Sequence, residues 1–151
     1  MGLAVVLAAV GAIVASVVAS GGGFVRHPVA WKDVSLRVGP ARWARPTISV
    51  VHDADKLAKL FQVALLPPQP RPPAIDFSKN DAVVIAVGPR SSTGYSLRVV
   101  RVTQSGNLDI LVRERTPRLG EKVRPEITYP YLLLVVPKLD KHVSVHYAGR
   151  Y

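Results

Sequence analysis

The hydrophobic pattern is clearest in the middle of the chain, where a short unbroken apolar run lies between turn residues. Residues 82–87 read Ala-Val-Val-Ile-Ala-Val, preceded by Asp81 and followed by Gly88-Pro89. A run of this length, rich in Val and Ile, is typical of a strand buried on both faces. Residues 88–94 then have the composition of a loop, and a second strand is expected from Tyr95.

This second strand is predicted to form a hairpin with the next one. Tyr95, Leu97 and Val99 share one face, whereas Val100 and Val102 share the other, so a β-bulge is expected near residues 99–100. Ser105-Gly106-Asn107 is a hairpin turn signal. On the return strand the inward positions are Leu108, Ile110 and Val112, and the outward ones are Asp109 and Arg113.

The remaining elements are predicted from the same alternation and from helical spacing. Residues 29–38 indicate a first strand or extended arm, residues 47–51 a second strand, and residues 53–64 an amphipathic helix capped by Asp53 or Asp55. Residues 67–73 are a proline-rich connector. Later strands are expected within residues 127–136, with Pro130 at an edge, a bulge or a strand start, and from Val143 to Tyr147.

Together these elements predict an α+β domain over residues 29–151. Its main part is a mainly antiparallel β-sheet of about six or seven strands, arranged as a sandwich or a partly open barrel. One amphipathic helix accompanies the sheet.

The N-terminal residues differ from the rest in being almost wholly apolar. Residues 2–18 carry no charged side chain, and the first one in the chain is Arg26. We expect residues 1–23 to be a signal peptide or an N-terminal membrane anchor, followed by a linker at 24–28. The expected location is therefore extracytoplasmic: secreted, or anchored to the cytoplasmic membrane by this segment. A buried helix of a soluble protein is the alternative.

Charge and composition narrow the choice of partners. The formal net charge is +10, which favours anionic partners, and the absence of cysteine excludes disulfides and cysteine metal sites. Basic side chains concentrate on the central hairpin at Arg98, Arg101, Arg113 and Arg115. They indicate a solvated face or attraction to anionic lipid headgroups, with nucleic-acid binding by a basic β-ribbon as an alternative.

Catalytic chemistry finds no support in the residue pattern. Ser91 and Ser92 lie in no nucleophile motif, and the four histidines, His27, His52, His142 and His146, have no metal-binding spacing. We therefore expect no enzymatic activity, no cofactor and no metal site.

Several short motifs, taken in order, resemble the PrcB C-terminal domain family. They are residues 75–80, the pattern Gly88-x-Arg90-x-x-Thr93-Gly94-Tyr95-Ser96, and a closing segment around Tyr129-Pro130-Tyr131. The resemblance covers about residues 75–145. It implies an exported bacterial protein of the kind that serves as an accessory subunit of a protease complex, with no catalytic residues.

The loop at the centre of this resemblance is the candidate protein-binding site. Ser92-Thr93-Gly94-Tyr95 is also similar to one inhibitory loop of the chagasin-type, immunoglobulin-like protease inhibitors, so a protease inhibitor is an alternative function. A structural turn in which Tyr95 packs into the sheet is the other reading. The candidate partner-binding residues are Arg90, Ser91, Ser92, Thr93, Gly94 and Tyr95.

Overall fold

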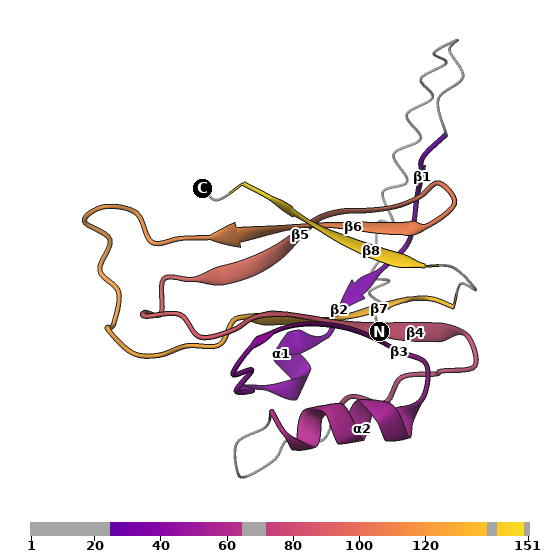
Figure 1. Ribbon diagram of the computed structural model, residues 1–151, viewed down its shortest axis with the longest axis horizontal. Coiled ribbons are helices and arrows are strands. Elements are labelled where there is room, and N and C mark those ends of the chain that lie inside the picture. Colours follow the sequence, from indigo (N-terminus) through magenta and orange to yellow (C-terminus); the bar gives the residue numbers. More distant parts are fainter. Residues whose placement is uncertain (1–24, 65–71, 139–141, 150–151) are drawn as a thin grey trace, which may run out of the picture.

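The computed structural model describes residues 25–64, 72–138 and 142–149. These residues form two four-stranded sheets that stack face to face, with two helices below one of the sheets (Figure 1). The described part of the chain is therefore mostly β-structure. Among these residues, no helix has the length and apolar character needed to cross a membrane. The expected leader at 1–23 lies outside the described residues.

The lower sheet in Figure 1 has the strand order β2-β7-β4-β3, and its neighbouring strands are all antiparallel. Its strands are β2 (Lys32–Asp33), β7 (Tyr131–Pro137), β4 (Asn80–Val87) and β3 (Pro46–Val51). Pro130 lies immediately before β7, at one of the strand positions that tolerate a residue without an amide hydrogen.

The upper sheet has the order β1-β5-β6-β8. Its strands are β1 (His27–Pro28), β5 (Ser96–Gln104), β6 (Leu108–Arg115) and β8 (Val143–Ala148). β5 and β6 form the predicted antiparallel hairpin, and their register shifts between Val99 and Arg101, which confirms the predicted bulge. β8 runs parallel to β6.

β4 is buried on both faces, as its apolar run predicts. Val83 and Ile85 pack between the two sheets against β6 residues such as Ile110. The alternate residues, Ala82 and Val84 among them, face the helical layer. β4 therefore lies in the middle layer of three: the upper sheet, the lower sheet and the helices. Burial on both faces explains why its apolar residues do not alternate with polar ones.

Two helices cover the outer face of the lower sheet: α1 (Ser35–Val38) and α2 (Ala54–Gln62). α2 confirms the predicted amphipathic helix. The side chain of Asp53 accepts a hydrogen bond from the backbone amide of Lys56 at 2.7 Å, and Leu57 and Phe61 are buried. The ring of Trp43 packs against Phe61 at a centroid distance of 5.4 Å, so this tryptophan belongs to the core under the helices.

The prediction of a single strand or extended arm over residues 29–38 was wrong. Only Lys32–Asp33 is a strand in this range, and α1 follows it. Val34 and Val38 are buried one helical turn apart, whereas Leu36 is 98% exposed, so the apparent alternation did not mark one inward face. The Asp33 carboxylate accepts hydrogen bonds from the amide and hydroxyl of Ser35, which favours a turn at this point.

Candidate functional site at the loop end of the sandwich

Two loops that are distant in sequence lie together at one end of the sandwich, on the left in Figure 1. We call residues 88–95 and 116–130 the loop pair. The first connects β4 of the lower sheet to β5 of the upper sheet, and the second returns from β6 to β7. Backbone hydrogen bonds run both ways between Arg90 and Thr128, from Arg90 N to Thr128 O at 2.8 Å and from Thr128 N to Arg90 O at 2.9 Å.

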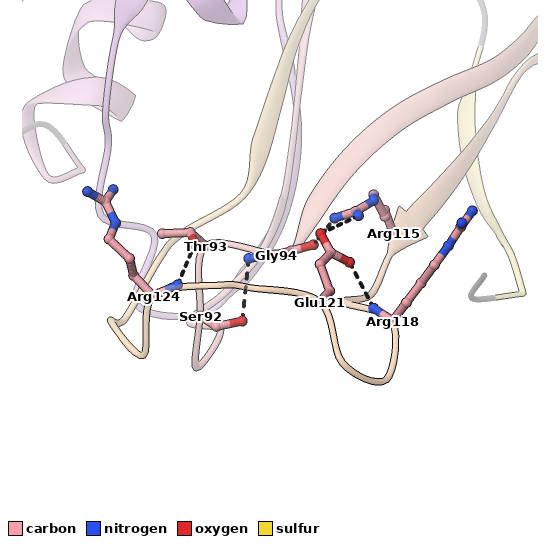
Figure 2. Close-up of polar contacts among 7 residues, drawn as sticks. All are labelled: Ser92, Thr93, Gly94, Arg115, Arg118, Glu121 and Arg124. Carbon is pink, nitrogen blue, oxygen red and sulfur yellow. Dashed lines mark hydrogen bonds and ion pairs between the residues drawn. The ribbon is translucent and has the colours of Figure 1, made fainter.

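Thr93 extends this pairing along the loops (Figure 2). Its amide donates to the carbonyl of Arg124 at 3.2 Å, and its hydroxyl accepts from the Arg124 amide at 3.0 Å. The hydroxyl of Thr128 donates to the carbonyl of Ser92 at 2.8 Å. The two loops are thus joined by backbone and side-chain hydrogen bonds, although regular β-strands are absent from this described region.

Gly94 lies where the two loops are closest. A Cβ atom built at this residue would lie 2.6 Å from Pro117 Cβ and 2.8 Å from Val123 Cγ1. Both distances are shorter than any real contact of a Cβ atom. Glycine is therefore required here by close packing between the loops rather than by a left-handed backbone conformation, because positive φ angles occur at other glycines.

A group of charged contacts fixes the turn at the start of the second loop (Figure 2). Arg115 donates one hydrogen bond to the carbonyl of Gly94 at 2.7 Å and another to the carboxylate of Glu121 at 2.5 Å. The other oxygen of Glu121 accepts from the amide of Arg118 at 2.9 Å. These two donors, Arg115 first and the Arg118 amide second, lower the pKa of Glu121 below its ordinary value.

A cleft of about 430 Å³ opens beside the root of the first loop. Two of its lining residues form an ion pair: the guanidinium of Arg90 pairs with the carboxylate of Glu114, whose side chain is 8% exposed. Arg90 also donates to the carbonyl of Val87 at 2.9 Å. Burial, followed by the negative charge of Glu114, raises the pKa of Tyr147. The residues that line this cleft, which we call the end cleft, are Pro46, Val87, Arg90, Glu114, Tyr147, Ala148 and Gly149.

The six candidate loop residues do not all point the same way. Ser91 and Thr93 are exposed, Ser92 and Gly94 are buried against the second loop, and Arg90 and Tyr95 are half-buried. Of these six candidates, only Ser91 and Thr93 are exposed, and Pro89 is the other exposed residue of the first loop. Arg90 contributes to the end cleft.

The second loop supplies most of the exposed surface of the loop pair. Leu119 is fully exposed at its turn, and Ile127 is 68% exposed. Arg118 precedes Leu119, and Lys122 and Arg124 lie between Leu119 and Ile127 in the sequence. The side chains of Arg118 and Arg124 extend away from the loops in Figure 2. Exposed apolar side chains on a braced loop that also carries arginines are suited to contact with another protein.

The four basic residues predicted on the hairpin divide into two groups. Arg98 and Arg113 lie opposite each other on β5 and β6, and Arg101 lies opposite Leu111 on the same ribbon. Arg115 instead belongs to the charged contacts with Gly94 and Glu121 in the loop pair, which we call the charged clamp. Arg101 also borders a smaller hollow of about 260 Å³, lined by Arg26, Arg101, Thr103, Asp109, Leu111 and His146.

Glu114 and Tyr147 were not among the residues predicted for the site. The sequence does indicate that Glu114 faces inward. Every second residue of this strand faces the core, and Glu114 follows Leu108, Ile110 and Val112 in that series. A carboxylate at an inward position requires a cation nearby, and Arg90 is that cation. Within the described ranges, no group of three potential metal-ligating side chains comes together.

Comparison with protein families identifies one match. Residues 82–137, from β4 to the end of β7, match the family described as PrcB C-terminal. The match includes both loops of the loop pair and confirms the family resemblance inferred from the motifs, over a shorter range than the expected 75–145, so that the motif at residues 75–80 lies outside it. Searches of curated proteins and of solved structures found no significant match.

Proposed function

We propose that this chain is a non-enzymatic, protein-binding domain that associates with a protease complex as an accessory subunit or modulator. The observation that carries this proposal is the match of residues 82–137 to the PrcB C-terminal family, whose namesake is an accessory subunit of a protease complex. The matched segment contains the loop pair, so the part of the chain that is similar to the family is also the part that forms the candidate contact surface.

The structure of the loop pair supports its role as that surface. Its backbone is braced by the contacts of Arg90, Thr93 and Glu121, so little ordering of the loops is needed when a partner binds. Leu119 and Ile127 offer apolar area that a partner can bury. The second loop joins β6 of the upper sheet to β7 of the lower sheet, so both of its ends are anchored in a sheet.

The arrangement of the serines and threonine supports a binding role over catalysis. Ser92 is buried, and its hydroxyl accepts a hydrogen bond from the amide of Gly94 at 3.4 Å. The hydroxyl of Thr93 is already an acceptor for the amide of Arg124. Both groups thus participate in bracing the loops, which is a structural use of their oxygens.

We further propose that the domain is exported or tethered to the membrane by its N-terminal segment. The support is the uncharged apolar sequence at residues 2–18. Cell fractionation with N-terminal sequencing tests this proposal. It requires either that the chain is found in the membrane fraction, or that it is found outside the cytoplasm after cleavage near Ala19. An intact chain in the cytoplasm would contradict it.

Co-purification tests the contact surface. We expect tagged full-length protein to retain a subunit of a protease complex, and the double variant Leu119→Ser/Ile127→Ser to lose it. The matched control is Leu36→Ser/Val63→Ser, which also removes two highly exposed apolar side chains, at 98% and 82%, but in or next to the helices. Equal retention by both variants would place the interface elsewhere on the molecule.

A further inference from the structure

In the described part of the chain, β8 is an edge strand without the usual protection against pairing. Natural sheets protect their edges with short strands, prolines or charged side chains. β1 and β2 are two residues long and contain Pro28 and charged Lys32, respectively, and β3 begins with Pro46. β8 has six residues, Val-Ser-Val-His-Tyr-Ala, with no proline, lysine, arginine or acidic residue.

The backbone of β8 directs a set of hydrogen-bonding groups away from the sheet. The carbonyl of His142 accepts from the amide of Leu108 on β6 at 2.9 Å, which fixes the direction of the alternating backbone groups. In a parallel pair of strands, the backbone N–H and C=O of one residue face the neighbouring strand, and those of the next residue face the opposite side. Val143, Val145 and Tyr147 therefore direct their amides and carbonyls to the open edge. Among the described residues, β6 is the one strand that pairs with β8.

The end cleft lies at the C-terminal end of this edge. Tyr147, Ala148 and Gly149 line it together with the apolar residues Pro46 and Val87. Tyr147 remains 48% exposed. A cleft of about 430 Å³ has room for a large side chain, and its position allows that side chain to come from a segment paired with β8.

We propose that the open edge of β8 binds an extended segment of a partner protein as an added strand. An apolar side chain of that segment enters the end cleft, and acidic residues on either side of it face the basic domain. Main-chain hydrogen bonds would supply affinity and the cleft would supply selectivity.

Charge favours an acidic segment over a second copy of this chain. The chain has a net charge of +10, so pairing of two copies would bring like charges together. Three basic residues, Lys138, Lys141 and Arg150, flank β8 in the sequence against one acidic residue, Asp140. In the β6–β8 register Arg113 lies opposite Ala148, at the end of β8 that borders the end cleft, whereas Asp109 lies opposite Ser144 near the other end. The inference rests on the proposed protein partner but uses a surface distinct from Leu119 and Ile127.

Amide hydrogen exchange of the full-length chain, followed by NMR, tests this directly. The probe is the blocked peptide Glu-Val-Glu-Phe-Glu-Val, and its matched control is Lys-Val-Lys-Phe-Lys-Val. We expect the amides of Val143, Val145 and Tyr147 to exchange rapidly without peptide and at least about tenfold more slowly with the acidic one. Ser144 and His146, whose backbone groups face β6, should change little.

Three results would overturn the inference: no slowing with the acidic peptide, equal slowing with the basic one, or slow exchange in the free protein that depends on protein concentration. The last would identify a second copy as the occupant.

Substitution at Val145 provides a second readout. Val145→Pro removes an outward amide, and proline is tolerated on the open side of an edge strand. Val145→Thr keeps that amide and a similar side-chain volume. We expect the proline variant alone to lose peptide protection of Val143 and Tyr147, and equal protection in both variants would contradict strand addition.

Failure of the acidic peptide to slow exchange, while the variant Leu119→Ser/Ile127→Ser still loses its partner, would overturn strand addition and leave the proposed function standing.

Discussion

Gly94 shows how a single residue fixes the spacing of the loop pair. Its α-carbon lies so close to Pro117 and Val123 that any side chain would push the second loop away from the first. The same residue offers its carbonyl to Arg115, which in turn holds Glu121. One glycine therefore couples close packing to the charged clamp.

We expect Gly94→Ala to lower the free energy of unfolding by about 1–3 kcal/mol, because the added methyl group overlaps with side chains that are themselves constrained. Urea denaturation measures this. Gly149→Ala is the matched control, since a Cβ atom there would meet no atom within 4 Å. Similar stability of the two variants would show that the loops can separate without cost.

The Arg90–Glu114 pair gives a second prediction for individual residues. Glu114→Gln leaves the guanidinium of Arg90, 22% exposed, without its counter-charge, and we expect a loss of about 1–3 kcal/mol in unfolding free energy. Glu126→Gln is the control, because its pair with Arg124 is exposed at both side chains and should contribute little. Equal effects of the two substitutions in urea denaturation would contradict this description of the end cleft.

Among the elements, the second loop depends on Glu121 for its shape. We expect Glu121→Gln to speed tryptic cleavage after Arg118, because the charge-assisted bonds to Arg115 and to the Arg118 amide are weakened. Limited proteolysis at neutral pH checks this, again with Glu126→Gln as the control. Unchanged cleavage in both variants would mean that other contacts hold the loop.

The same carboxylate predicts an acid sensitivity of the loop. Because the pKa of Glu121 is lowered in the folded chain, its contribution is complete above the ordinary carboxyl pKa. It is lost as the pH falls through the lowered pKa. Hydrogen exchange at Arg118, corrected for the intrinsic pH dependence, should accelerate in that acidic range in the wild type and much less in Glu121→Gln. Loss of protection already near neutral pH would contradict this assignment.

Elements with a strong local pattern were predictable from the sequence. The hairpin with its bulge and the helix at 54–62 have apolar spacing that matches their conformation, and the run at 82–87 is continuously apolar because it is buried on both faces. The prediction of a strand or extended arm over residues 29–38 failed because Leu36 is apolar but exposed, and because the short helix α1 depends on packing of Val38 in the core. Its conformation is decided by tertiary contacts rather than by local alternation.

On the scale of the whole molecule, the loop at 88–94 could be predicted as a loop but not as half of a braced pair. Thr93 and Arg124 are 31 residues apart, and Ser92 and Thr128 are 36 apart. Contacts at such separations follow from how the sheets stack, so one sequence does not reveal them. The end cleft likewise combines residues from β3, β4, β6 and β8.

The proposed protein contact lies at the loop end of the sandwich. The exposed apolar residues there, Leu119 and Ile127, lie in the segment that matches the PrcB C-terminal family. The match and the braced surface thus concern the same part of the chain. A measurement that reports physical contact at Leu119 tests both together.

The most direct measurement is photo-crosslinking in cells of the source organism, with the photoreactive amino acid p-benzoylphenylalanine placed at Leu119 and, in a control chain, at Leu36. Both positions are essentially fully exposed, but only Leu119 belongs to the loop pair. We predict that the chain modified at Leu119 crosslinks to a subunit of a protease complex and that the control does not. Equal crosslinking from both positions, or none from Leu119, would contradict the proposed contact surface.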